Sequence, residues 1–129
     1  MVIDSSALVA IFMTEPERGS LLAKIMEADT RRLSATNLFE TGIVLEARRG
    51  EAAGREFDLF VLRMGLQIVS VDAEQVELAR QAWRKYGKGR HPAALNFGDC
   101  FAYALAKLYD EPLLARGSDF KQTDLELCG

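Results

Sequence analysis

The chain has 129 residues, of which 49% are hydrophobic, and a formal net charge of −3 at pH 7. That length matches one ordinary domain, and its two cysteines are too few for a disulfide framework, so we expect an apolar core and a reducing, cytoplasmic location. The slightly acidic balance argues against a general nucleic-acid-coating protein, and no apolar run approaches the ~20 residues that span a bilayer, so no membrane association is expected.

The first half of the chain alternates short apolar runs with helical patterns. Residues 1–4 predict a buried strand that ends at Asp4, and Ser5 or Ser6 is expected to cap the helix that follows. Further along, we expect a helix over 17–28, a strand near 33–35, a helix over 37–48 and Gly50 at its end.

The second half repeats this alternation. A helix that includes Phe57 and Met64 precedes a strand over 67–71, and Asp72 with Gln75 three residues later resembles a capping box. Further elements expected are a helix containing Val76, Ala79 and Trp83 on one side, a loop over 87–92, a helix capped by Asn96, a strand over 112–115 and an edge strand within 123–128. Strands separated by helices predict an α/β fold: a single three-layer domain over residues 1–129 with a mostly parallel central sheet.

Four acidic residues lie just past these apolar runs: Asp4, Glu40, Asp99 and Asp119. In an α/β fold such positions converge on one edge of the sheet. Four carboxylates cannot share a pocket in the ionised state unless a cation joins them, and a hard divalent cation is the usual partner. The pattern therefore indicates metal-assisted phosphate chemistry.

Each acid also has a purely structural interpretation. Asp4 could cap the first helix, and Glu40 could complete a capping box with Asn37, which is the favoured interpretation for Glu40 taken alone. Asp99 begins a strongly apolar helix, where an unpartnered carboxylate is costly, so a functional role is favoured there. Asp119 lies in an ordinary turn composition. Their shared location at the ends of elements favours a common site.

A basic strip precedes the third acid. Residues 80–91 contain no acid, and Arg84, Lys85, Lys88 and Arg90 are expected either to contact RNA phosphates or to form a solvated helix face. His91, the only histidine, lies in a loop beside Pro92, where a surface or structural role is favoured over catalysis.

Four segments resemble PIN-domain proteins, and in particular the VapC-type ribonuclease toxins of VapBC toxin–antitoxin pairs. They are MVIDSSALVAIFMTEPE, SATNLFETGIVLEARRG, YGKGRHPAALNFGDCFAYALAK and EPLLARGSDFKQTDLE. The similarity extends over essentially the whole chain, with these segments in the same order. Many relatives have Asn or Asp where this chain has Ser118 and Thr where it has Ser5, but both serines keep a small oxygen-bearing side chain. The resemblance implies a Rossmann-like sheet between helices and metal-dependent hydrolysis of RNA.

The resemblance also implies roles for the acids. Asp4 and Asp99 match the family's direct ligands of Mg²⁺ or Mn²⁺, whereas Glu40 and Asp119 match acids that act through water or complete the metal shell. Whether one or two ions take part is left open. The implied partners are an RNA substrate, a second copy in a homodimer, and a VapB-like antitoxin whose arginine reaches the acidic pocket. Apolar residues that could line the antitoxin groove, although a core position is favoured for them, are Leu8, Ile11, Phe39 and Ile43.

Several rival functions share an acidic Mg²⁺ pocket. A phosphoacceptor receiver domain usually has two acids after its first strand, whereas Ser5 and Ser6 follow Asp4 here. A haloacid-dehalogenase-type phosphatase needs a second Asp two residues after the first, where this chain has Ser6. An inactive binding module and a PIN nuclease that processes RNA without an antitoxin are the remaining alternatives.

Overall fold

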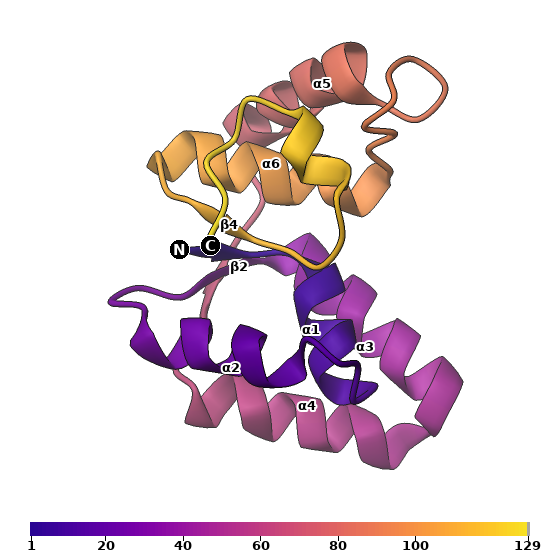
Figure 1. Cartoon of the computed structure of the whole chain (residues 1–129), viewed down its shortest axis with the longest axis vertical. Helices are drawn as coiled ribbons and strands as arrows, with labels where there is room; N and C mark the ends of the chain where they lie inside the picture. Colours follow the sequence, from indigo (N-terminus) through magenta and orange to yellow (C-terminus); the bar gives the residue numbers. More distant parts are fainter. Residues whose placement is uncertain (129) are drawn as a thin grey trace.

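The computed structural model describes residues 1–128, in which a parallel sheet lies between two layers of helices (Figure 1). Its strands are β1 (Val2–Ile3), β2 (Arg32–Ser34), β3 (Gln67–Val69) and β4 (Leu113–Leu114). They are arranged in the order β3-β2-β1-β4, and every pairing is parallel. The predicted α/β class with a parallel central sheet is therefore confirmed. Gly129, the last residue of the predicted domain, lies outside the described residues.

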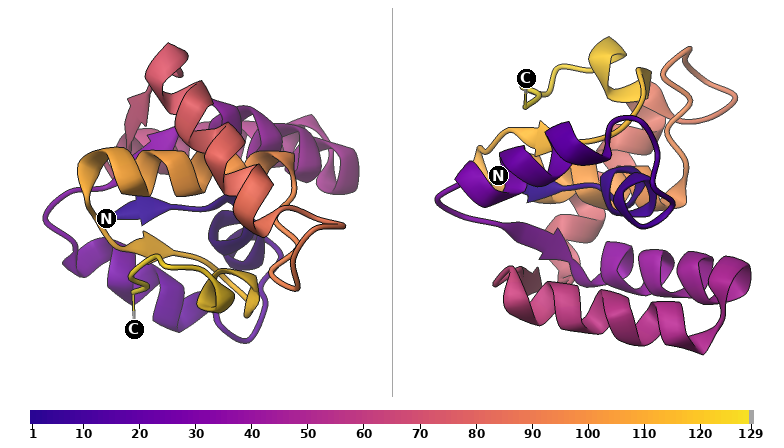
Figure 2. Two further views of the ribbon diagram at one scale, coloured as in Figure 1. Left: turned by 90° about the horizontal axis from the view of Figure 1, so that it is seen from above. Right: turned by 60° about the horizontal axis from the view of Figure 1, so that its bottom comes forward.

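Helices cover both faces of the sheet (Figures 1 and 2). They are α1 (Ser5–Phe12), α2 (Arg18–Glu27), α3 (Ala35–Arg49), α4 (Glu51–Arg63), α5 (Ala73–Tyr86) and α6 (Phe97–Tyr109), with a 3₁₀ helix η1 (Asp119–Gln122) near the end. None of these six α-helices has the combined length and apolar character that crossing a membrane requires.

Alternation along the short strands divides the core in two. Val2 and Leu113 pack with the buried residues of α5 and α6, whereas Ile3, Leu33 and Leu114 pack with those of α1 to α4. Successive side chains of a strand point to opposite faces, so two or three residues per strand suffice to join both helical layers. All five of these side chains are essentially inaccessible to solvent.

Two strands pass directly into helices, and this connection positions the site. Only Asp4 separates β1 from α1, and Ser34, the last residue of β2, is the N-cap of α3. Parallel strands point their carboxyl ends the same way, so the first turns of α1 and α3 lie at one edge of the sheet.

Three local predictions are wrong. The first helix is capped by Asp4, not by Ser5 or Ser6, and α3 begins at Ala35 because Ser34 caps it, so Asn37 is an interior helical residue. Asp72 does accept a hydrogen bond from the Gln75 backbone at 2.9 Å, but the Gln75 side chain donates to the Ser70 carbonyl, so only half of that capping box forms.

The tail does not form the expected edge strand over 123–128. Within the described part of the tail, only an isolated parallel bridge joins Leu127 to Leu113. Asp124 accepts hydrogen bonds from Tyr103 at 2.8 Å and Lys107 at 2.6 Å, which draws the chain toward α6 and away from β4.

Candidate functional site

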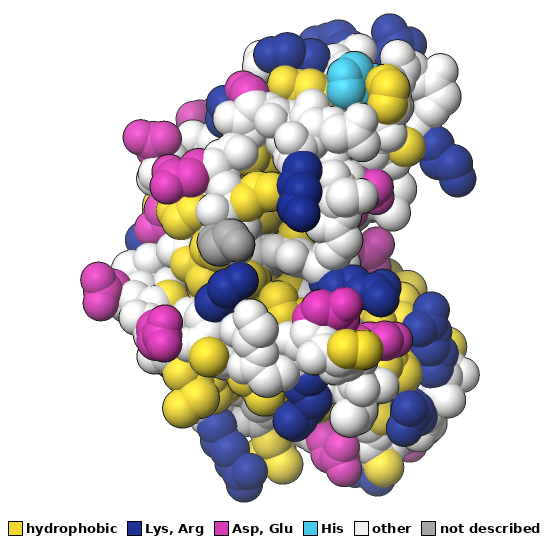
Figure 3. Space-filling view, viewed as in Figure 1, with side chains coloured by type: hydrophobic (Ala, Val, Ile, Leu, Met, Phe, Trp, Pro, Cys, Tyr) yellow, Lys and Arg dark blue, Asp and Glu magenta, His cyan; other side chains and the backbone are white. Residues whose placement is uncertain are grey.

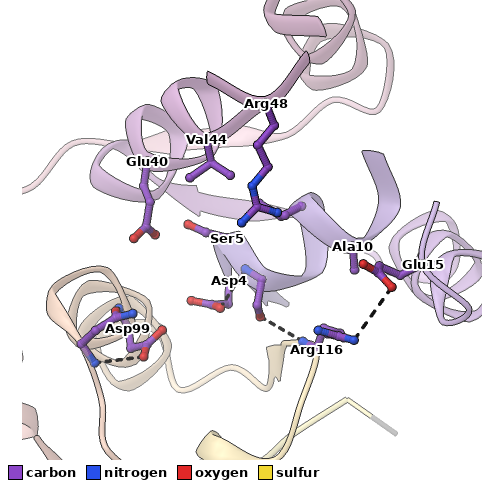
Figure 4. A pocket seen from close by; sticks show the side chains of 12 residues that line it. Asp4, Ser5, Ala10, Glu15, Glu40, Val44, Arg48, Asp99 and Arg116 are labelled. Carbon is purple, nitrogen blue, oxygen red and sulfur yellow. Dashed lines mark hydrogen bonds and ion pairs between the residues drawn. The ribbon is translucent and has the colours of Figure 1, made fainter. Parts of the chain in front are cut away.

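Three of the four predicted acids surround one cavity at the carboxyl edge of the sheet. Asp4, Glu40 and Asp99 line this cavity of about 330 Å³, to which we refer as the acidic pocket. Figure 4 shows the three carboxylates pointing into the same space from three different elements. None of the ion pairs formed within residues 1–128 involves any of them. The sequence-based prediction that these acids converge agrees with this placement.

Asp4 is both a helix cap and a pocket residue. Its Oδ2 accepts the Ser6 backbone N–H at 3.0 Å, whereas its Oδ1 is buried and has no hydrogen-bond partner among the described residues. Burial raises the pKa of this carboxyl group, and the nearby charge of Glu40 raises it further. A buried acceptor oxygen without a partner is costly, so Oδ1 is suited to a ligand that the polypeptide does not supply.

Asp99 also uses one carboxylate oxygen in a helix cap and keeps the other out of the cap. Asn96 caps α6 by accepting the Asp99 backbone N–H at 2.9 Å, and Asp99 Oδ2 accepts the Asn96 backbone N–H at 3.0 Å in return. Burial, followed by the charge of Asp4, raises the pKa of Asp99 to about 7, and Glu40 and Asp119 add to the effect. The alternatives of cap and site residue are therefore compatible at both aspartates.

Glu40 is placed by contacts that the sequence did not reveal. Asn37, one helical turn earlier on α3, donates through Nδ2 to the Gly98 carbonyl at 3.1 Å and to Glu40 Oε1 at 3.4 Å. A Cβ on Gly98 would overlap the Glu40 carboxylate, so glycine here lets that carboxylate lie directly against the start of α6. The predicted capping box of Asn37 and Glu40 is wrong. The signal that identifies the pair instead is their three-residue spacing on one helix face.

Asp119 does not line the acidic pocket. It is exposed at the start of η1, although its charge contributes to the raised pKa of Asp99. In the part of the chain that the structure describes, no three Asp, Glu, His or Cys side chains are grouped closely enough to bind one metal ion directly. The expected four-acid cluster is therefore three acids around a cavity and one at a distance.

Two arginines that were not predicted complete the pocket wall. Arg48 of α3 and Arg116 line the same cavity as the acids. Arg116 lies 3.7 Å from Glu17 and 4.0 Å from Glu15, and its backbone N–H donates to Ser6 Oγ at 3.0 Å. The pocket thus combines oxygen ligands on one side with guanidinium groups on the other, as a phosphate-handling site requires.

The four predicted RNA-contact residues have different surroundings. Arg84 lies 3.6 Å from Glu77, and the Lys85 ammonium lies over the Tyr86 ring. The Arg90 guanidinium lies 4.5 Å from the centroid of the Trp83 ring, and Lys88 is exposed in the loop after α5. The absence of acids between residues 80 and 91 therefore does not leave Arg84 unpaired, since Glu77 lies two helical turns away.

His91 has a structural role, as predicted. Its Nδ1 accepts the Ala93 backbone N–H at 3.0 Å, and its ring packs edge-on against Tyr86.

The core interpretation holds for only half of the predicted groove residues. Leu8 and Ile11 are buried in the core, but Phe39 and Ile43 are exposed on α3. Phe39 and Ile43 lie on the opposite face of α3 from Asn37 and Thr41, which are buried.

Comparison with known proteins gives the same assignment along the whole chain. The PIN domain family model matches residues 1–126. A protein named Ribonuclease VapC from Mycolicibacterium smegmatis is 50% identical over 125 residues, which cover 97% of this chain and 97% of that protein.

Solved structures share the fold at lower identity. The VapC20 toxin of Mycobacterium tuberculosis, described as cleaving the sarcin–ricin loop, matches with a TM-score of 0.77 and 20% identity, covering 96% of this chain and 95% of that one. VapBC2 from Rickettsia felis, bound to a DNA fragment of its promoter, matches with a TM-score of 0.76 and 17% identity, covering 98% and 96%.

Proposed function

The chain belongs to the PIN-domain family, and within it to the VapC ribonucleases, and on that basis we propose that it hydrolyses RNA phosphodiester bonds as the toxin of a toxin–antitoxin pair. The observation that carries the proposal is Asp4 Oδ1, a buried oxygen with no partner in residues 1–128, beside Asp99, whose pKa is raised to about 7. Receiver domains and haloacid-dehalogenase-type phosphatases are set aside by the family assignment.

The acidic pocket fits a divalent cation, Mg²⁺ or Mn²⁺. Asp4 and Asp99 each keep one carboxylate oxygen free of helix capping, and we assign these oxygens as direct ligands. Glu40 acts through water in this proposal, whereas Asp119, which lies outside the pocket, contributes its charge. When bound, the cation supplies Lewis acidity that lowers the pKa of water and neutralises charge on the phosphate oxygens.

The remaining pocket residues position the substrate. Glu40, fixed by Asn37 and by the close approach of Gly98, accepts a hydrogen bond from the attacking water. Arg48 and Arg116 bind the phosphate oxygens from the opposite wall of the cavity. Glu15 and Glu17 hold the Arg116 guanidinium at the rim until the phosphate arrives.

The proposed partners follow from the relatives. The solved structure from Rickettsia felis is a VapBC complex, and this supports a VapB-like antitoxin as the partner of this chain. An arginine of that antitoxin suits a pocket whose carboxylates have no cation of their own. A homodimer and a cytoplasmic location remain predictions.

The test is expression of the wild-type chain and of Asp99→Asn in bacteria, followed by sequencing of RNA 5′ ends. We expect growth arrest and new 5′ ends with the wild-type chain, neither of them with the variant, and relief of the arrest when the antitoxin is co-expressed. New ends that persist at the same positions in Asp99→Asn would overturn the catalytic assignment.

A further inference from the structure

A second cavity adjoins the acidic pocket. It has a volume of about 530 Å³, lies between α5 and the start of α6, and is lined mainly by apolar side chains that include Trp83, Phe97 and Phe101. Asn96 lines both cavities, so the two meet at the first residue of the α6 cap. We call the second cavity the aromatic groove. Its size lies within the range of small-molecule and cofactor sites.

The aromatic groove leaves large rings in contact with solvent. Trp83 is 48% exposed and Phe97 is 76% exposed. Val76, Ala79 and Trp83 fall at helical spacing on α5. Ala79 is buried in the core, whereas Val76 and Trp83 remain exposed on the side that lines the groove. Phe101 packs edge-on against Phe97 with ring centroids 5.2 Å apart, which restrains the exposed ring. Exposed apolar surface of this kind marks a binding site more often than chance.

The Trp83 ring is held in place by its neighbours. A Cβ on Gly87 would overlap both the Trp83 backbone and its ring, so the chain after α5 passes directly against the indole. The Arg90 guanidinium lies over the ring, and Arg90 Nε donates to the Arg84 carbonyl at 3.3 Å. A restrained aromatic ring loses little conformational entropy when a flat ligand stacks on it.

The charges around the groove are positive. Arg80 and Lys88 line it, Arg90 covers part of Trp83, and no Asp or Glu is among its lining residues. Figure 3 shows Lys and Arg side chains gathered at this end of the molecule, around α5 and the loop after it. Lys85 is a suitable control for Lys88. It lies near the end of α5, its ammonium contacts the Tyr86 ring, and it does not line the groove.

We propose that the aromatic groove binds an unpaired base of single-stranded RNA beside the phosphate that the acidic pocket holds. This inference rests on the proposed ribonuclease function and adds a site for a base of the substrate. Aromatic platforms flanked by cations are the common means of binding single strands, because every base has a face to stack and every nucleotide a phosphate. A base inside a duplex cannot reach the groove, so a duplex serves as the negative control.

A second copy of the chain fits the groove less well. In a two-fold interface the same patch faces itself, so two sets of Arg80, Lys88 and Arg90 would share one interface, with no carboxylate among the residues that line the groove. RNA brings the opposite charge to the same residues.

The chain has a single tryptophan, so its fluorescence reports on the groove directly. The experiment uses the full chain carrying Asp4→Asn, which stops cleavage and leaves the Asn96 cap intact. A single-stranded RNA of about 8 nucleotides, a typical length for such surfaces, is compared with the same strand made abasic and with a duplex. We expect quenching of Trp83 by the single strand alone, at concentrations where the other two have little effect.

Variants then separate the contributions. Because replacing Trp83 removes the only tryptophan, binding by the variants is measured by fluorescence anisotropy of an end-labelled strand. Trp83→Leu and, as a second variant at an exposed position, Phe97→Ala should each weaken binding of the single strand roughly 5- to 100-fold. Trp83→Phe keeps a ring and should remain close to the parent. Lys88→Ala should weaken binding and make it less sensitive to salt, whereas the matched control Lys85→Ala should change neither.

Three results would overturn the proposal. One is cleavage by the otherwise wild-type chain with an unchanged KM in both Trp83→Leu and Phe97→Ala, which would leave the nuclease standing without a base site. Another is a change from dimer to monomer in Trp83→Leu at unchanged RNA affinity, which would assign the groove to a second copy. The third is equal quenching by the abasic strand. Loss of the ribonuclease function itself shows separately, as absence of cleavage by the wild-type chain.

Discussion

The carboxylates at the two edges of the sheet have opposite pKa shifts. At the amino edge, Glu111 accepts hydrogen bonds from Arg32 at 2.9 Å and from Thr30 at 3.1 Å, and the amino group of Met1 lies 3.3 Å away. Burial disfavours the charged form of Glu111, but these bonds outweigh it and lower its pKa. At the carboxyl edge, Asp4 and Asp99 accept backbone N–H groups but no cationic side chain within residues 1–128 pairs with them, and their pKa values are raised.

The difference teaches how to tell a structural carboxylate from a functional one. Asp124, near the tail, follows the pattern of Glu111: burial opposes its charge, but Lys107 and Tyr103 donate hydrogen bonds and lower its pKa. A carboxylate that is already paired with a cationic group of the chain needs no further ligand. One that is buried without a cation is unfavourable in its charged form, and either a proton or a bound cation relieves that cost.

The largest expected effect comes from removing charge at the carboxyl edge. Asp4→Asn keeps the size of the side chain and an oxygen for the Ser6 cap but loses the charge that holds the cation. We expect RNA cleavage to fall by about 100-fold or more, because a metal ligand contributes several kcal/mol to the transition state. Cleavage rates at saturating Mg²⁺ measure this, and thermal unfolding should show a folded protein.

The matched change at the amino edge is Glu111→Gln. It should leave cleavage near the wild-type rate and lower the free energy of unfolding by about 1–2 kcal/mol, the typical contribution of charge-assisted hydrogen bonds. If Glu111→Gln abolished cleavage in protein that is still folded, the contrast between the two edges would fail.

A smaller loss is expected when the geometry changes but every charge stays. Gly98→Ala places a methyl group where the Glu40 carboxylate lies, and this flexible side chain must then move aside. We expect cleavage to fall roughly 10- to 100-fold, because displacements of about 1 Å are costly in a positioned site. The measurement is the cleavage rate together with the unfolding temperature.

Gly42→Ala is the control for that variant. Gly42 lies on α3, where an added Cβ would meet nothing within 4 Å in residues 1–128 apart from the neighbouring residues and backbone of its own helix. Alanine should therefore leave cleavage unchanged and raise stability by about 0.5–1 kcal/mol. Equal loss of activity in both glycine variants would mean that Glu40 is not the cause.

The pH dependence of stability tests the strain at the carboxyl edge. Asp99 has a pKa of about 7 in the folded chain against an ordinary value of 3.8, so between these values the folded chain holds a proton that the unfolded chain releases. Stability without divalent cation should therefore fall as the pH rises from about 4 to about 7, by about 2 kcal/mol once partial solvent screening is allowed for. Asp99→Asn should flatten this slope, and Mg²⁺ should restore the lost stability of the wild-type chain. Urea unfolding across this pH range measures both.

The smallest effect is expected at the most distant acid. Asp119 is exposed and reaches the site only through the field it exerts at Asp99. Asp119→Asn should lower cleavage less than about tenfold, and the difference should shrink in high salt, because exposed charges are screened. A loss equal to that of Asp4→Asn would show that Asp119 binds the cation directly.

The positions of the strands and helices could be predicted from the sequence because they follow local patterns. β1, β3 and α6 begin where apolar runs, capping residues and glycines indicate. The start of α3 was misplaced because Ser34 and Asn37 are both good caps, and only the end of β2 at Ser34 decides between them.

The site could be predicted only in outline. The acids were recognisable as residues at the ends of elements, but the roles of Asn37, Arg48 and Arg116 depend on contacts between segments far apart in the chain. Asn37 reaches the Gly98 carbonyl across 61 positions, and no local pattern encodes such a bond. The strip over 80–91 predicted the right region for positive charge but not which cations are free, since that depends on the helix face that each one occupies.

The α6 cap has a consequence for how such an enzyme selects its cut. Asn96 and Asp99 are locked together by two reciprocal hydrogen bonds, and Asn96 forms the wall between the acidic pocket and the aromatic groove. A base in one cavity and a phosphate in the other are then separated by a rigid helix end, which fixes the distance between them. The backbone linking the recognised base to the broken bond would have one fixed length, so every cleavage product should begin at the same offset from that base.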